Sequence, residues 1–163
     1  MTPLSIRLPL PADRDPIHWI AASAGGFSPA ELEAALALFD AAVEDGAAAQ
    51  QVCVLEDAGI PAGFACYGPT PRTEGTWQLH AIAVEHAAQG KGYGRHMLAY
   101  VESEVRRGGG RLMLVESRSA EGCARANAFY ERTAYTLVAR IPAFYRPGED
   151  KLVFAKTLEA SSA

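Results

Sequence analysis

The sequence predicts a single α/β (α+β) domain in which short strands are combined with a few amphipathic helices. The chain has 163 residues, a length that suits one ordinary hydrophobic core. Hydrophobic residues make up 49% and charged residues 21%, as in soluble globular proteins and unlike disordered or coiled-coil chains. Apolar runs alternate with stretches of helical spacing in the order β-α-α-β-β-β-α-β-α-β-β. We expect residues 1–158 to form the domain and residues 159–163 to form a flexible tail.

The first half of the chain predicts a strand followed by two helices. Leu4–Leu8 is a short apolar run that ends at prolines, and a helix is expected from the polar turn Asp13–Asp15 to about Ser23. Ser28-Pro29-Ala30-Glu31 is a capping box with proline at the first helical position. Apolar residues then recur at helical spacing as far as Gly46, so a second helix is expected there.

Strands dominate the prediction for the rest of the chain. Gln50–Glu56 and Gly63–Tyr67 flank a turn and predict a hairpin, and Thr76–Val84 predicts the next strand. A glycine-rich stretch leads into a helix that ends at Gly108-Gly109-Gly110. The remaining elements are expected to be a strand over Arg111–Ser117, a helix over Ala124–Thr133, an extended segment over Thr136–Ile141, a loop over Phe144–Asp150 and a last strand over Leu152–Thr157.

Charge and cysteine content exclude several classes of function. Fifteen Lys and Arg residues against nineteen Asp and Glu residues give a net charge of −4, the wrong sign for a general binder of nucleic acid or anionic membranes. Cys53, Cys66 and Cys123 lack the spacing of a metal site, and no apolar run is long enough to cross a membrane. We therefore expect a cytoplasmic protein with no nucleic acid, membrane or metal partner, and we consider a homodimer as its assembly.

The segment Gln89-Gly90-Lys91-Gly92-Tyr93-Gly94-Arg95 lies between a strong strand and a strong helix. Glycines allow the backbone to curl around an anion, and the first N–H groups of a helix have no partner within the helix. This junction therefore predicts a phosphate site, to which Lys91 and Arg95 add charge. The dinucleotide fingerprint would need glycine at Arg95, and a Walker loop would need Ser or Thr after Lys91, so neither motif fits.

With Gln89, Gly92 and Gly94, this loop resembles the Arg/Gln-x-x-Gly-x-Gly/Ala signature of the GNAT superfamily of CoA-dependent N-acyltransferases. The resemblance extends over nearly the whole chain. It implies a mixed, mostly antiparallel sheet of about seven strands with flanking helices. It also implies that the pyrophosphate of acetyl-CoA, the donor, binds the N–H groups of residues 89–95, Gly90 and Tyr93 included. The pantetheine arm would run between the fourth and fifth strands, which splay apart, beside Ile82, Ala83 and Val84.

Acetyl transfer to an amine needs a group that removes a proton from the amine, and the ordinary pKa of histidine, about 6.5, suits that role. His80 lies on the fourth strand, in a segment similar to that of arylalkylamine N-acetyltransferases, where histidines at the positions of His80 and Gln78 are implicated in proton removal. Gln78 cannot act as a base. His80, or Glu116 on the next strand acting through water, would remove the proton. A His80 that is only hydrogen-bonded within the strand stays open as the non-catalytic interpretation.

The helix around residues 123–132 resembles the family pattern Asn-x-x-Ala-x-x-x-Tyr, whose tyrosine points at the CoA sulfur. Tyr130 takes that place, with Phe129 beside the cofactor, whereas Cys123 replaces the asparagine that commonly binds pantetheine. The resemblance implies direct transfer and does not favour a nucleophilic Cys123. An amphipathic helix that simply buries Phe129 and Tyr130 is the structural alternative.

The resemblance places the acceptor opposite CoA, between the first two helices and the loop joining the last strands. Phe27, Gln78, Phe144 and Tyr145 are the expected acceptor contacts, although a packed loop lid accounts for these aromatic residues equally well. The sequence thus predicts an N-acetyltransferase that moves acetyl from acetyl-CoA to a primary amine of a small molecule or peptide. A non-catalytic acyl-CoA-binding regulatory module and a site for another nucleotide, such as ATP, stay open as alternatives.

Overall fold

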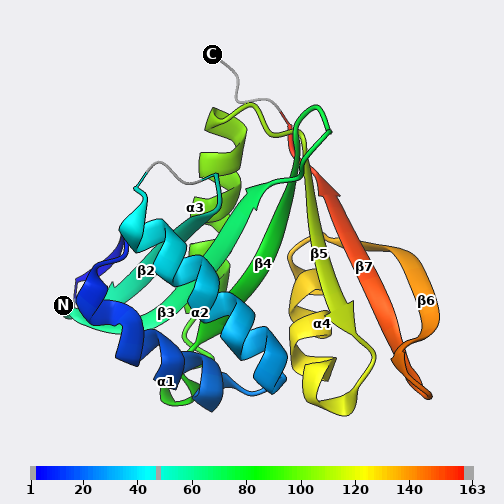
Figure 1. The fold of residues 1–163 in the computed structure, drawn as a ribbon, viewed down its shortest axis with the longest axis horizontal. Helices are drawn as coiled ribbons and strands as arrows, with labels where there is room; N and C mark the ends of the chain where they lie inside the picture. The colour runs from blue at the N-terminus through cyan, green and yellow to red at the C-terminus, as the bar shows by residue number, and fades with distance from the viewer. Residues whose placement is uncertain (1–2, 47–48, 160–163) are drawn as a thin grey trace.

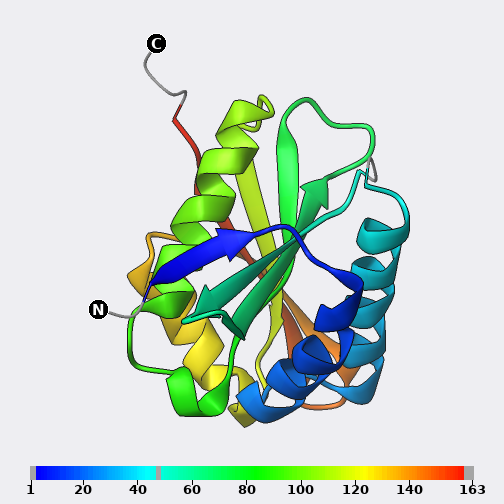
Figure 2. The ribbon, with the colours of Figure 1, turned by 90° about the vertical axis from the view of Figure 1, so that its left-hand side faces the viewer.

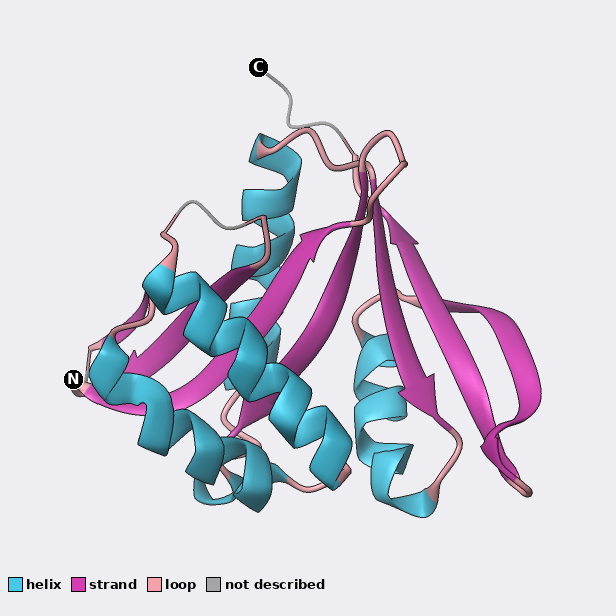
Figure 3. Cartoon of the chain, viewed as in Figure 1, coloured by secondary structure: helices cyan, strands magenta, loops and turns pink. Residues whose placement is uncertain are grey.

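A computed structural model describes residues 3–46 and 49–159 (Figure 1). Four helices and seven strands form the domain, and Figure 3 shows their distribution. The strands are β1 (Leu4–Arg7), β2 (Gln51–Asp57), β3 (Ile60–Pro69), β4 (Thr76–Val84), β5 (Leu112–Arg118), β6 (Thr136–Arg146) and β7 (Glu149–Thr157). The helices are α1 (Arg14–Ala24), α2 (Pro29–Glu44), α3 (Tyr93–Arg107) and α4 (Ala124–Arg132), with short 3-10 turns at Pro11–Asp13, His86–Ala88 and Glu121–Cys123.

All seven strands belong to one mixed sheet in the order β1-β2-β3-β4-β5-β7-β6. Neighbouring strands are antiparallel except β4 and β5, which are parallel. Helices α1 and α2 cover one face of the sheet, and α3 and α4 cover the other (Figure 2). The predicted element order and the mixed, mostly antiparallel sheet are therefore confirmed.

The parallel pair β4–β5 separates after only four residue pairs. Pairing runs from Thr76 opposite Leu112 to Leu79 opposite Val115 and then stops. The end of β5 keeps its antiparallel partner β7, while β4 remains paired with β3 as far as Val84. Figure 1 shows the two strands side by side at one end and far apart at the other. The far half of β4 therefore presents a backbone edge without a strand partner.

Two apolar clusters hold the helices on the sheet. On the α1/α2 face, Ile17, Ile20 and Phe39 pack on β2 and β3. On the other face, Met97 and Val101 follow each other at helical spacing and are fully buried. These contacts fix the start of α3 and the body of α2 on opposite sides of β4, which positions both walls of the site.

Most predicted elements occur with ends shifted by a few residues, and the strand predicted over Thr76–Val84 is β4 with the same bounds. The predicted loop over Phe144–Asp150 is wrong, because β6 continues to Arg146 and β7 begins at Glu149. Pro142 lies in β6, an edge strand, where proline is tolerated only at a bulge or an unpaired position. The register of β6 against β7 indeed shifts between Ile141 and Arg146. The Ala143 N–H donates to the Asp150 carboxylate at 2.9 Å, which fixes this bulge. Of the predicted tail, residues 160–163 lie outside the described residues.

The predicted capping box at the start of α2 is present. The Glu31 N–H donates to Ser28 Oγ at 3.2 Å, and the Ser28 N–H donates to Glu31 Oε2 at 3.1 Å. We expect Ser28→Ala to lower the free energy of unfolding by about 1 kcal/mol, because a helix-terminal N–H loses its acceptor. Urea unfolding followed by circular dichroism measures the change.

Ser103→Ala, in the interior of α3, is the matched control and should leave stability unchanged or slightly raised. Equal effects of the two substitutions would contradict a capping role for Ser28.

Candidate active site

A cavity of about 650 Å³ lies where β4 and β5 separate. Seven consecutive residues of β4, from Gln78 to Val84, line it. Successive strand residues point to opposite faces, so a cavity that touches all of them runs along the strand edge. The start of α3, the end of β5, α4, α2 and the segment between α1 and α2 complete its walls.

At one end of the cavity, the glycine loop joins β4 to α3. Gly90 and Gly92 have φ of +84° and +83°, a left-handed conformation that a residue with a side chain adopts only under strain. The Gln89 side chain donates to the Val84 carbonyl at 3.1 Å, so it holds the loop against the end of β4. Since the first N–H groups of α3 have no helical partner, this cavity wall is a site for an anion.

His80 lies at a bulge in β4. Ala81 pairs with Cys66 of β3 and Leu79 pairs with Tyr67, so His80 is the extra residue between two register positions. A bulge re-aims the side chain of its unpaired residue. The imidazole lines the cavity, and its Nε2 lies 2.6 Å from Oε1 of Gln50.

The surroundings of His80 change its protonation. His80 is partly open to solvent, but burial of part of the imidazole lowers its pKa below the ordinary value, and the charge of Glu116 partly opposes this shift. Glu116 reaches the cavity from β5 and pairs with Lys151 at 3.1 Å. The lowered pKa leaves His80 neutral at pH 7, with a nitrogen lone pair that can accept a proton.

Tyr130 forms the opposite wall of the cavity from α4. Its ring packs against Phe129, Tyr135 and Phe154 at centroid distances of 5.7, 6.0 and 5.6 Å, which leaves the side chain almost fully buried. Burial raises the pKa of the phenol far above its ordinary value, so Tyr130 stays a hydrogen-bond donor.

Arg118, at the end of β5, connects the segments that form the remaining wall of the cavity. Its guanidinium binds Glu31 of α2 at 3.0 Å, the buried Glu149 of β7 at 2.8 Å and the Gly26 carbonyl at 2.8 Å. Cys123 lies beside the same carbonyl, with Sγ 3.7 Å from the Gly26 oxygen. Burial raises the pKa of the Cys123 thiol, which disfavours the thiolate that a nucleophile needs.

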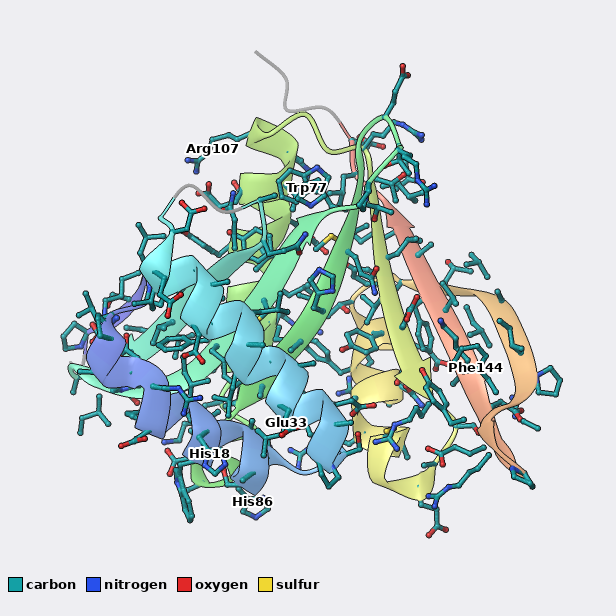
Figure 4. The ribbon with its side chains drawn as sticks, in the orientation of Figure 1. His18, Glu33, Trp77, His86, Arg107 and Phe144 are labelled. Carbon is teal, nitrogen blue, oxygen red and sulfur yellow. The ribbon has the colours of Figure 1, made fainter. Side chains whose placement is uncertain are left out.

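The cavity collects most of the residues predicted from the sequence. His80, Glu116, Tyr130, Cys123 and Phe129 line it, together with Phe27, Gln78, Tyr145 and the loop residues Gln89, Gly90, Gly92, Tyr93, Gly94 and Arg95. His18, His86 and His96 are exposed, as expected, and Figure 4 shows His18 and His86 at the α1 side of the molecule.

Two predicted contacts do not line the cavity. Lys91 points its Nζ to within 5.9 Å of the Tyr93 ring centroid and stays exposed. Phe144 lies in the β6–β7 region (Figure 4), where its ring packs edge-on against Tyr145 at 4.9 Å and lies under Lys151 at 4.5 Å. Phe144 therefore supports Tyr145, which does line the cavity.

Sequence reasoning also missed residues of this site. Arg118 and Glu31 are 87 positions apart, and no local pattern relates them. Arg125 of α4 lines the cavity, and its place just after Cys123 in the motif helix could have indicated it. Gln50, which contacts His80, precedes a strand that is not adjacent to β4 in the sheet.

An open strand edge beside a helix N-terminus, with a histidine and a buried tyrosine near it, offers an extended site for a long anionic ligand. The model of the acetyltransferase (GNAT) family matches residues 16–135, and the chain belongs to this family. GNAT enzymes take the acetyl group from acetyl-CoA. The chain is an N-acetyltransferase of the GNAT type.

Solved structures agree with this assignment. A protein from Desulfovibrio desulfuricans assigned to the GNAT family of acetyltransferases is 37% identical, with a TM-score of 0.91 over 96% of this chain and 100% of that one. The ribosomal-protein-S18-alanine N-acetyltransferase of Escherichia coli has the same fold, at 20% identity, a TM-score of 0.75 and coverage of 98% and 97%. A protein from Salmonella typhimurium assigned as an acetyltransferase, solved with its cofactor acetyl-CoA, matches at 23% identity, a TM-score of 0.74 and coverage of 99% and 97%. No protein of curated function matches the chain significantly in sequence.

Within residues 3–46 and 49–159, no group of three or more His, Cys, Asp or Glu side chains is arranged to hold a metal ion. No helix in the same part of the chain is long and apolar enough to cross a membrane.

Because Lys91 and Arg95 lie differently relative to the cavity, we expect their substitutions to change the affinity for acetyl-CoA by different amounts. Arg95 lines the cavity and Lys91 does not, so Arg95→Ala should weaken acetyl-CoA binding about tenfold or more through the loss of a charge-assisted contact. Lys91→Ala should change affinity by less than about threefold, the effect of an exposed charge. Isothermal titration calorimetry of both variants measures this, and a larger loss for Lys91→Ala would contradict the placement.

Proposed function

We propose that this enzyme transfers the acetyl group from acetyl-CoA directly to a primary amine of a small molecule or peptide, in a ternary complex. One observation carries the proposal. A single cavity runs along the unpaired edge of β4 and joins the glycine loop to His80, Glu116 and Tyr130. An anion site, a base and a hydrogen-bond donor would therefore share one cavity, as acyl transfer requires.

The donor would lie along β4. The N–H groups at the start of α3, with Arg95 and Arg125 on the cavity wall, suit a pyrophosphate. Ile82, Ala83 and Val84 lie on the edge of β4 that has no strand partner, which suits the amides of an extended arm because strand edges bind such groups through main-chain hydrogen bonds. The Val84 carbonyl already accepts a hydrogen bond from Gln89, so Ile82 and Ala83 would provide most of these contacts. When bound, acetyl-CoA would supply the acetyl group as a thioester. The residues present therefore fit this donor.

His80 would prepare the acceptor. An alkyl amine near pKa 10 is almost wholly protonated at pH 7 and must lose a proton before its nitrogen can bond to a carbonyl carbon. The neutral imidazole of His80 can take that proton directly, and Glu116 provides a second route through a bridging water.

Tyr130 would stabilise the leaving group. As the new C–N bond forms and the C–S bond breaks, the sulfur gains negative charge, and the Tyr130 O–H can donate a hydrogen bond to it. Full proton transfer from a phenol whose pKa is raised by burial would be uphill, so the hydrogen bond is the contribution we assign to Tyr130. The proton of the ammonium passes through His80 to solvent before the attack, a second N–H proton is lost to solvent as the amide forms, and the CoA thiolate leaves and takes up a proton from solvent.

Phe27, Gln78 and Tyr145 would contact the acceptor, because they line the cavity on the side of α2 and the β6–β7 hairpin. All three cysteines are buried free thiols, which agrees with a reducing compartment, and we propose a cytoplasmic location. Arg118 does not offer its charge to the acceptor, since Glu31 and Glu149 already pair with it.

Binding of the donor is testable without knowing the acceptor. Acetyl-CoA at about 100 times its dissociation constant should stabilise the fold by about 2.7 kcal/mol and raise the midpoint of thermal unfolding by several degrees. ATP at the same concentration should shift it much less. Differential scanning fluorimetry measures both shifts, and equal stabilisation by ATP would argue for a general nucleotide site. A panel of primary amines, with release of free CoA as readout, then identifies the acceptor.

The roles of His80 and Tyr130 can be separated by kinetics. His80→Ala should lower kcat by about 10²- to 10⁴-fold, the usual contribution of a general base. Tyr130→Phe should lower it by about 10- to 100-fold through loss of one hydrogen bond to a charged sulfur. The control substitutions are His18→Ala, at an exposed histidine, and Tyr100→Phe, at a tyrosine outside the cavity.

The pH profile adds an independent check, because kcat/KM requires His80 unprotonated. Since burial lowers its pKa, activity should fall on the acid side below about pH 6.5. Glu116→Gln removes the charge that raises this pKa, so the acid limb should move to still lower pH. An acid limb that does not move in Glu116→Gln and persists in His80→Ala would assign the titration to another group.

A further inference from the structure

We propose that Gln50 is a positioning residue for the reaction: its amide oxygen accepts a hydrogen bond from His80 Nε2 and holds the imidazole in the tautomer whose Nδ1 accepts the amine proton. This inference rests on the proposed function, in which His80 is the base. Gln50 itself does not line the cavity and would act only through His80.

The contact between Gln50 and His80 spans the sheet. Gln50 immediately precedes β2, whereas His80 is on β4, and β3 lies between these strands. The distance from His80 Nε2 to Gln50 Oε1 is 2.6 Å, within the range of a strong hydrogen bond. A side chain that starts beside β2 must therefore cross over β3 to reach the imidazole.

Gly68 of β3 makes this crossing feasible. A Cβ atom at Gly68 would lie 2.1 Å from Oε1, 2.5 Å from Cδ and 2.7 Å from Nε2 of Gln50. The amide of Gln50 therefore rests directly on the backbone of Gly68, in space that any side chain would fill. Gly68 pairs with Gln78, two residues before His80, so the crossing point lies beside the bulge that aims the imidazole.

The hydrogen bond selects one form of the imidazole. A neutral histidine has one N–H donor and one nitrogen acceptor, and a carbonyl oxygen can only accept. With Gln50 Oε1 against Nε2, the hydrogen lies on Nε2 and the lone pair lies on Nδ1. The same N–H remains a donor when His80 is protonated, so the ring keeps its position throughout the proton transfer.

The charged groups near His80 do not replace this contact. Glu116 approaches from β5 and is paired with Lys151, and Glu31 of α2 is paired with Arg118. On the β3 side, the neighbours of the bulge are Cys66 and Tyr67, whose pKa values are raised by burial, so both stay uncharged at neutral pH. Gln50 is thus the hydrogen-bond partner of the ring among the described residues.

Three substitutions of the full chain test the inference. Gln50→Leu removes the acceptor oxygen, and Gly68→Ala places a methyl group where the Gln50 amide lies and displaces it. We expect each to lower kcat about tenfold or more, because the base loses its orientation, while KM for acetyl-CoA stays within about twofold. Gln50→Glu keeps an acceptor oxygen and adds a negative charge. It should retain most of kcat and move the acid limb of kcat/KM to higher pH. Gln51→Leu, at the adjacent exposed glutamine, is the matched control and should behave as the unsubstituted enzyme.

Nitrogen-15 NMR of the histidine side chains gives a readout that packing alone would not move. In the unsubstituted enzyme above the pKa of His80, its spectrum should show the tautomer protonated at Nε2 and unprotonated at Nδ1. In Gln50→Leu and Gly68→Ala it should show a mixture of the two tautomers. Thermal unfolding with acetyl-CoA confirms that each variant is folded.

The outcomes distinguish this inference from the function on which it rests. If His80→Ala lowers turnover but Gln50→Leu and Gly68→Ala do not, Gln50 has no positioning role and the proposed function is unaffected. A tautomer protonated at Nδ1 in the unsubstituted enzyme would equally overturn the inference. Full turnover in His80→Ala would overturn both, because His80 would not be the base.

Discussion

The separation of β4 from β5 is the constraint on which the rest of this structure depends. In a sheet, each strand edge needs a partner for its N–H and C=O groups, and here β4 loses its partner after Leu79. β5 is paired with β7 along its whole length, and α4 places Tyr130 and Phe129 beside the gap. The gap is thus bordered by free main-chain groups along one side and by aromatic rings on the other. Such a lining suits a ligand in which amides alternate with methylene groups.

Two features of β4 position the site: its open edge, which runs along the strand, and the bulge at His80, which directs a side chain across it. Along its length, the edge of β4 leads from the glycine loop toward the middle of the sheet. Across its width, the bulge at His80 turns one side chain toward the place where the edge becomes open. Gln50, which precedes β2, reaches His80 by crossing β3 at Gly68. The position of His80, the proposed base, therefore depends on the bulge in β4 and on the contact with Gln50.

Much of the fold and part of the site could be predicted from the sequence because these features are local. The capping box at Ser28, the bounds of β4 and the glycine loop each depend on residues close together in the chain. The two last strands were predicted, but not their full length, because Pro142 and the turn residues Pro147 and Gly148 resemble a loop, whereas the bulge near Ala143 lets pairing resume at Arg146.

The site residues that sequence reasoning missed are held by contacts between distant segments. Arg118 meets Glu31 and Glu149 only after three separate elements have assembled, and Gln50 meets His80 only across an intervening strand. Lys91 differs in the opposite way: the motif predicts a contact with the donor, but the side chain does not line the cavity and its Nζ lies near the Tyr93 ring. Tertiary structure, which no short motif records, decided these positions.

The ion pairs of Arg118 have a consequence for how this enzyme could be redesigned. They join the α1–α2 segment, α2 and β7 into one wall, although Gly26 and Arg118 are 92 residues apart. The donor side, by contrast, is built largely from the continuous segment that runs from β4 through the glycine loop. Under the proposed function, acceptor preference and donor binding would therefore depend on separate parts of the chain. A library restricted to Phe27, Leu38 and Tyr145 would vary the acceptor contacts. It would leave the donor contacts and the ion pairs of Arg118 unchanged.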